Sequence, residues 1–119
     1  MTSYKRGDVV LVLFPDSNLQ TAKKRPALVV QADNLQTNLP QVIVAMITSS
    51  MMRANHKSRV TVLQNSPEGR QSGLQFDSVI VTDNLVTVKE KFIDKTLGNL
   101  STMNAVEFAL AHTFGLKLA

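Results

Sequence analysis

Short apolar runs, separated by polar or proline-containing segments, dominate the first two thirds of the chain and set the strongest limit on its fold. Six of them have the length and composition of strands: 9–14, 27–30, 42–47, 59–63, 78–81 and 85–88. Most are near-continuously apolar, as strands buried on both faces of a barrel or sandwich are, whereas 59–63 alternates like a half-exposed strand. Residues 65–69 form a turn cluster. The pattern predicts a mainly β fold.

The apolar residues change their spacing near the C-terminus. Beyond 98–101 they recur at helical intervals, at Met103, Val106, Leu110 and Phe114, with Ala105 and Ala109 beside them. Ser101 is placed to cap the start of this helix and Gly115 to end it. No repeat or linker interrupts the chain, and its 119 residues suffice for one core. We expect one domain, residues 1–119, in which a compact β-barrel of five or more strands is closed by a C-terminal helix.

Positive charge is concentrated in the middle of the chain. The net charge is +4, yet residues 17–75 hold seven basic residues against two acidic ones, and the remainder is slightly acidic. Most of these basic residues fall in 15–25 and 48–58, two predicted loops that are longer than their neighbours require, and such loops are often functional. Clustered lysine and arginine side chains bind phosphates well, so one interpretation of this basic region is a binding site for a polyanion. The other interpretation is a basic surface that contacts only solvent.

Several kinds of chemistry are excluded by residues that the chain lacks. It has no cysteine, which excludes disulfides, cysteine nucleophiles and thiolate metal sites and fits a reducing cytoplasm. Its acidic residues are scattered singly, so no metal site is readable, and no glycine loop would cradle a phosphate. No apolar run approaches the ~18 residues of a membrane span, and the N-terminus is a poor signal peptide. We expect a cytoplasmic protein without metal, cofactor or membrane contact.

Only two histidines are present, so a ribonuclease of the paired-histidine type would have to use His56 and His112. His112 falls near the end of the predicted helix, one residue off its apolar stripe, where a surface or capping role is the expected one. His56 lies in the basic segment 48–58, where solvent exposure is the default and ligand contact is the alternative.

A different constellation comes from two strand ends. Arg25 precedes Pro26 at the entrance of one apolar run, and Thr48 and Ser49 follow the exit of another. Arginine presents a planar fork of donors that matches phosphate oxygens and keeps its charge at physiological pH, and a threonine hydroxyl adds one more donor. A surface salt bridge for Arg25 and a strand-terminating turn at 48–49 are the plain alternatives. The residues alone leave both interpretations open.

The order of the motifs adds a family resemblance. GDVVLVLFP at 7–15, KRPALVV at 24–30 and VAMITS at 44–49 resemble the ordered motifs of MazF/PemK-type toxins of type II toxin–antitoxin systems. GLQFDSVI at 73–80 and LGNLS at 97–101 fit in the same order, so that the resemblance extends from about Tyr4 to Gly115. The first motif is weak alone, whereas the whole set in this order and spacing is specific.

The resemblance implies a small SH3-like β-barrel of the CcdB/PemK-like kind that forms a homodimer and is neutralised by a cognate antitoxin. It implies a sequence-specific, metal-independent endoribonuclease that cleaves single-stranded RNA, such as mRNA, to 2′,3′-cyclic phosphate and 5′-hydroxyl ends. The family's catalytic arginine and threonine match Arg25 and Thr48. We expect the RNA to be held by Lys23, Lys24, Ser49, Arg53, Lys57, Arg59 and Asn84.

The chain departs from the family pattern just after 78–81. The family shows Asp-Gln, an apolar residue and a basic one where this chain has Asp83, Asn84, Leu85 and Val86. If this segment holds RNA, the change implies weaker binding or a different recognised sequence.

A second class of function stays open on the same fold. It is a non-catalytic toxin that acts on DNA gyrase, as CcdB-type toxins do, or a degenerate nucleic-acid-binding module. CcdB-type toxins carry their gyrase contacts in the C-terminal helix, and the ending 114–119 does not resemble theirs. Arg25 and Thr48 favour the ribonuclease.

Overall fold

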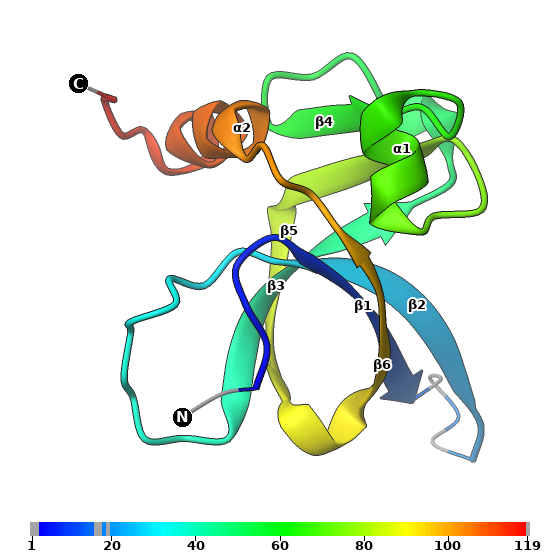
Figure 1. The fold of residues 1–119 in the computed structure, drawn as a ribbon, viewed down its shortest axis with the longest axis vertical. Helices are drawn as coiled ribbons and strands as arrows, with labels where there is room; N and C mark the ends of the chain where they lie inside the picture. Colours follow the sequence, from blue (N-terminus) through cyan, green and yellow to red (C-terminus); the bar gives the residue numbers. More distant parts are fainter. Residues whose placement is uncertain (1–2, 16–17, 19, 119) are drawn as a thin grey trace.

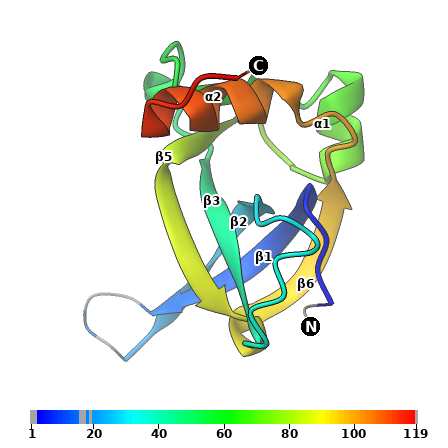
Figure 2. The same cartoon turned by 90° about the vertical axis from the view of Figure 1, so that its left-hand side faces the viewer.

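The computed structural model describes residues 3–15, 18 and 20–118. Along the chain its elements, with η marking a 3-10 turn, are β1 (Asp8–Pro15), β2 (Ala22–Val29), β3 (Gln41–Thr48), η1 (Met51–Arg53), β4 (Arg59–Val62), α1 (Pro67–Ser72), β5 (Ser78–Lys89), η2 (Glu90–Phe92), β6 (Ile93–Asn99) and α2 (Asn104–Phe114). The strands of the described residues form one antiparallel sheet in the order β4-β5-β3-β2-β1-β6. The sheet curves strongly (Figure 1), and α2 lies across one end of it (Figure 2). The expected mainly β barrel with a C-terminal helix is confirmed.

The apolar runs of the central strands are near-continuous because both faces of the curved sheet are buried there. Val9 packs in one cluster with Leu28, which Val106 of α2 joins, whereas Val10 packs in a second cluster with Ala27. Neighbouring residues on a strand point to opposite faces, so each run serves both clusters. The near-continuous apolar pattern in the sequence follows from this double burial.

β5 shows that the predicted break between 78–81 and 85–88 is wrong. The two runs form one strand, and residues 82–84 bulge out of its pairing with β3. Thr82 is buried there, and its hydroxyl donates to the carbonyl oxygen of Ser58 at 2.5 Å. The polar residues interrupt the apolar pattern as a turn would, but Thr82 and Asp83 are hydrogen-bonded to partners outside the strand.

The start of α2 differs from the prediction, and its end does not. The helix begins at Asn104 with Met103 at its N-cap position, so Ser101 lies two residues too early to cap it; the Ser101 hydroxyl donates to Gln71 Oε1 at 3.1 Å. Gly115 has a φ of 66° and ends the helix in the left-handed conformation, as predicted.

The apolar face of α2 ends earlier than predicted. Val106 and Ala109 are buried, but Phe114 is 59% exposed. In the last turn the side chain of Thr113 contacts Thr82, with 2.9 Å between the two hydroxyl oxygens. Thr113 therefore takes the position facing the sheet that the sequence pattern assigns to Phe114.

Two segments are more regular than the sequence predicts. β2 begins at Ala22, so 23–25 lie in a strand paired with β1 rather than in a loop. The turn cluster 65–69 continues into α1, whose first turn is capped where Ser66 Oγ accepts the Gly69 N–H at 3.0 Å. In addition, strand β6 forms in a segment for which the sequence predicts no element.

Within the described ranges, no helix has the length and apolarity needed to cross a membrane.

Candidate active site

The site begins where β2 and β3 separate. Their last pair is Ala27 with Met46; beyond it β2 pairs with β1, while the end of β3 pairs with β5. Pro26 stands at the divergence, and its ring nitrogen carries no N–H that could extend the ladder. A groove opens between the two strands, with Arg25 on β2 and Thr48 on β3.

Arg25 is exposed near the middle of β2, opposite Val12 of β1. No carboxylate within residues 3–15, 18 and 20–118 forms an ion pair with it, so the salt-bridge interpretation finds no partner in that part of the chain. Its neighbour Lys24, by contrast, pairs with Asp94 at 3.3 Å. The Arg25 guanidinium is therefore available to an anionic ligand.

Thr48 is half-buried at the end of β3. Its Oγ1 accepts the backbone N–H of Ser50 at 3.1 Å. This bond closes the turn that ends the strand, and it leaves the hydroxyl proton for a second acceptor. Thr48 can thus serve as both a turn residue and a donor to a ligand.

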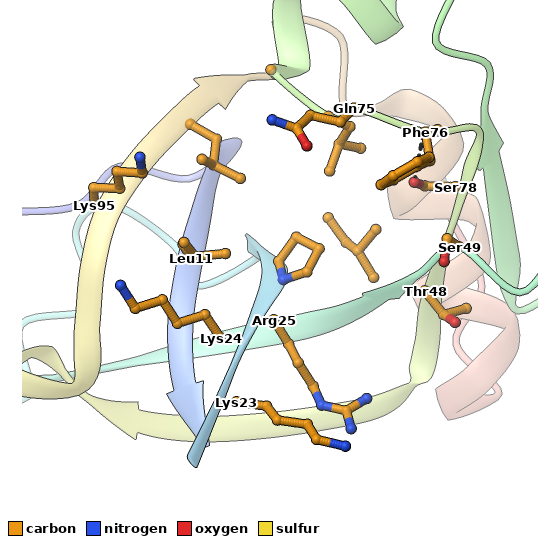
Figure 3. Close-up of a pocket in the computed structure, with 15 residues that line it drawn as sticks. Leu11, Lys23, Lys24, Arg25, Thr48, Ser49, Gln75, Phe76, Ser78 and Lys95 are labelled. Atoms are coloured by element: carbon orange, nitrogen blue, oxygen red, sulfur yellow. Dashed lines mark hydrogen bonds between the residues drawn. The ribbon is translucent and has the colours of Figure 1, made fainter. Parts of the chain in front are cut away.

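The groove holds a cavity of about 590 Å³ (Figure 3). Its cationic and hydroxyl-bearing lining residues are Lys23, Lys24, Arg25, Lys95, Thr48, Ser49 and Ser78. In Figure 3 the hydroxyl side chains of Ser78, Ser49 and Thr48 lie in a row across the opening from β2, which carries Arg25 and Lys23. Among the described residues that line the cavity there is no aspartate or glutamate. The electrostatic potential of the groove therefore favours anions.

A second cavity of about 350 Å³ adjoins the first. Arg25, Ile47 and Thr48 line both cavities, and the second also has Arg53 and Asn84 in its wall. An anion held by Arg25 and Thr48 would therefore have room for a substituent on each side.

The two cavities gather seven of the nine site residues expected from the sequence. Lys23, Lys24 and Ser49 line the larger cavity, Arg53 and Asn84 the smaller, and Arg25 and Thr48 both. Lys57 and Arg59 line neither of these cavities.

Arg59 is occupied by bonds within the protein. Its Nη2 lies 2.9 Å from Asp83 Oδ2, its Nε donates to Oδ1 at 3.3 Å, and its Nη1 donates to the carbonyl oxygen of Arg53 at 3.2 Å. The hydrogen bond with Arg59 is the main cause that lowers the pKa of the Asp83 carboxyl, and the same bond raises the pKa of Arg59. Arg59 thereby ties η1, which carries Arg53, to the bulge of β5.

The two histidines meet outside the groove. The rings of His56 and His112 lie edge to face with centroids 6.0 Å apart, and neither residue lines either of the two cavities. His56 Nδ1 accepts the N–H of Ser58 at 3.0 Å, which places the proton of its neutral form on Nε2. Both are exposed, as expected. The described groove does not contain a histidine pair.

Four polar or aromatic residues that line the larger cavity are not predicted from the sequence: Gln75, Phe76, Ser78 and Lys95. The first three belong to the motif 73–80, which the resemblance matches without giving its residues a role. Its position just before a buried strand is the signal that could have found them. Lys95 lies on β6, whose largely exposed side chains show no apolar period.

These features define a small β-barrel protein with a cationic groove, and comparison with known proteins supplies the family. Residues 5–114 match the family described as PemK-like, MazF-like toxin of type II toxin–antitoxin systems. The Endoribonuclease MazF of Staphylococcus epidermidis is 31% identical over 115 residues, which cover 96% of this chain and 92% of that protein. The chain belongs to the MazF/PemK family of toxins.

Solved structures share the fold. An endoribonuclease in complex with its cognate antitoxin, from mycobacterial species, has a TM-score of 0.73 at 21% identity and covers 98% of this chain and 100% of its own. A chain of the MazE–MazF structure (Form-II) from Deinococcus radiodurans has a TM-score of 0.71 at 15% identity, with coverages of 96% and 97%. The expected family and fold are confirmed, and the expected enzyme class agrees with the names of the staphylococcal and mycobacterial proteins.

Proposed function

We propose that this chain is a sequence-specific endoribonuclease toxin that cleaves single-stranded RNA, mRNA included, in the groove between Arg25 and Thr48. One observation carries the proposal: an arginine without a carboxylate partner among the described residues stands with a hydroxyl donor at the junction of two cavities. The naming of the Staphylococcus epidermidis relative as an endoribonuclease supports it.

The reaction that suits this groove is an internal transesterification. The 2′-oxygen of one nucleotide attacks the adjacent phosphorus, and the new P–O2′ bond forms as the P–O5′ bond breaks. The 2′-hydroxyl loses a proton and the leaving 5′-oxygen gains one, which gives a 2′,3′-cyclic phosphate and a 5′-hydroxyl. Because the nucleophile belongs to the RNA, the protein needs to supply charge and position rather than a nucleophile.

Arg25 and Thr48 would act on the phosphate. Negative charge grows on the nonbridging oxygens during the attack, and donors already in place stabilise it. The guanidinium offers a fork of N–H groups, and the Thr48 hydroxyl offers one more donor. Guanidinium groups are poor bases in proteins, so the proposed role of Arg25 is that of clamp or acid rather than base. With this positive charge at the phosphate, we propose that the reaction requires no metal or cofactor.

The remaining contacts would hold the RNA on either side of the cleaved bond. Lys23 and Lys24 would meet backbone phosphates, with Ser49 beside them, in the larger cavity. In the smaller cavity Arg53 and Asn84 would contact the neighbouring nucleotide. Lys57 would add charge at a distance, and Arg59 would act by holding the backbone of η1 in place.

We further propose that a cognate antitoxin neutralises the enzyme and that the toxin works as a homodimer in the cytoplasm. The mycobacterial structure with its cognate antitoxin supports the first part. A groove lined by four cations and, among the described residues, by no carboxylate would suit an acidic segment of such a partner. The absence of cysteine fits the reducing compartment.

Cleavage of a long RNA in EDTA, followed by identification of the product ends, tests the proposal. We expect cuts at a recurring sequence, 2′,3′-cyclic phosphate ends and intact DNA of the same sequence, since DNA lacks the 2′-hydroxyl. RNA that stays intact would contradict the enzyme. RNA that stays intact while gyrase is trapped on DNA would establish the CcdB-like function instead.

A further inference from the structure

An exposed aromatic ring stands at the rim of the larger cavity. Phe76, in the loop 73–77 between α1 and β5, is 65% exposed and lines the cavity together with Thr48, Ser49 and Ser78. In Figure 3 its ring lies beside Ser78, on the same side of the opening as Thr48 and Ser49. The ring thus lines the same cavity as the hydroxyl groups and the arginine that are proposed to bind the phosphate.

The loop that carries Phe76 is fixed on its N-terminal side. Gly73 ends α1 with a φ of 75°, and a Cβ at this residue would lie 2.2 Å from the carbonyl oxygen of Leu97. The next residue, Leu74, is 8% exposed and belongs to the hydrophobic cluster under α2. The backbone before Phe76 is therefore held against β6 and the core.

The loop is fixed on its C-terminal side as well. Asp77 Oδ1 accepts the backbone N–H of Gln64 at 2.8 Å, and the Ser78 hydroxyl donates to the carbonyl oxygen of Phe76 at 2.8 Å. A ring mounted on such a backbone loses little conformational entropy when a ligand covers it.

A single exposed phenylalanine is ordinary on a protein surface. Phe108 on α2 is an example: it is 66% exposed, and it lines neither of the two cavities. Phe76 differs from Phe108 in the residues around it, because it shares a cavity with cationic and hydroxyl-bearing side chains. An aromatic ring beside such groups is the combination that binds single-stranded nucleic acids by stacking.

We propose that Phe76 stacks on a nucleobase next to the scissile phosphate and so fixes the position of the RNA on the Arg25–Thr48 clamp. The proposal rests on the proposed ribonuclease function. Every base has a π-face, so stacking holds a nucleotide without selecting its identity. Phe76 therefore contributes affinity and register, and sequence selection comes from other side chains of the groove.

The test uses a 2′-O-methyl oligonucleotide that carries the recognised sequence and cannot be cut. We expect Phe76→Ala to raise its Kd by about 5- to 150-fold, the range that loss of one base–aromatic contact produces. Phe76→Trp should restore affinity, and Phe108→Ala should match the wild type. An abasic site at the stacked nucleotide should weaken wild-type binding and leave the binding of Phe76→Ala unchanged.

A fluorescence signal reports the stacking directly. The chain has no tryptophan and one tyrosine, so Phe76→Trp carries a single tryptophan whose fluorescence can be excited selectively, as does the control Phe108→Trp. We expect the oligonucleotide to quench the first and not the second. Equal Kd values for wild type and Phe76→Ala, or an unquenched Phe76→Trp, would overturn the stacking. Cleavage of the matching RNA is measured in parallel, so that failure to cut rejects the proposed enzyme separately from the stacking.

Discussion

Arg25 and Thr48 stand on two strands whose last pair, Ala27 with Met46, lies two residues from each of them, and both residues line the two cavities that meet there. The separation has a covalent origin, because Pro26 lacks the N–H that would continue the ladder. The same residue that ends the pairing therefore opens the space beside Arg25. Two hydrogen-bond donors at such a junction can bind one phosphate while the RNA strand continues into the cavity on either side.

Thr48 gives the first prediction. Thr48→Val keeps the shape of the side chain and removes its donor, so we expect the single-turnover cleavage rate to fall by about 10²-fold, the effect of losing one such donor. Thr48→Ser retains the hydroxyl and should stay within about tenfold of the wild-type rate. Cleavage by Thr48→Val at the wild-type rate would remove Thr48 from the mechanism.

The ion pair of Arg59 and Asp83 gives a dependence of stability on pH. Hydrogen bonding from Arg59 lowers the pKa of Asp83 in the folded protein below its ordinary value of 3.8. The stabilisation is therefore complete above the pKa of the unfolded chain and is lost as pH falls through the lower folded pKa. Thermal unfolding should show a Tm difference between wild type and Asp83→Asn that is constant above about pH 5 and shrinks under more acidic conditions. A difference that persists undiminished at about pH 2 would show that the ion pair is not its source.

Two glycines with left-handed backbones provide a matched pair of substitutions. Gly115→Ala meets no atom within 4 Å, so it should lose only the about 1–2 kcal/mol of conformational strain. Gly73→Ala carries the same strain and also drives its Cβ toward the carbonyl oxygen of Leu97, 2.2 Å away. Urea unfolding should therefore show a distinctly larger loss of stability for Gly73→Ala. Equal losses would mean that the loop before Phe76 is not held against β6.

The buried strands, and the presence of Arg25 and Thr48 in one candidate site, could be predicted because their signals are local. Each apolar run carries its own pattern of double burial, and Arg25 and Thr48 lie inside ordered motifs. β6 could not be found in this way, because Ile93 is its one buried side chain and an edge strand of exposed residues has no hydrophobic period.

Other features depend on contacts between distant residues. In the bulge at 82–84, Thr82 and Asp83 are hydrogen-bonded to Ser58 and Arg59, 24 residues away in the chain in both cases. The local sequence therefore predicts a turn at residues 82–84, where the structure has a bulge within one strand. Phe76 poses a similar difficulty: its position just before a buried strand marks the loop, but it does not tell whether the ring faces a groove or the core.

The most direct test of the central claim is the cleavage rate of Arg25→Ala under single-turnover conditions in EDTA. Arg70→Ala is the matched control, since Arg70 is exposed on α1 and lines neither of the two cavities. We predict that Arg25→Ala cuts about 10²- to 10³-fold more slowly than the wild type, with an unchanged Tm because Arg25 is exposed, and that Arg70→Ala cuts normally. Equal rates for Arg25→Ala and Arg70→Ala would contradict the account.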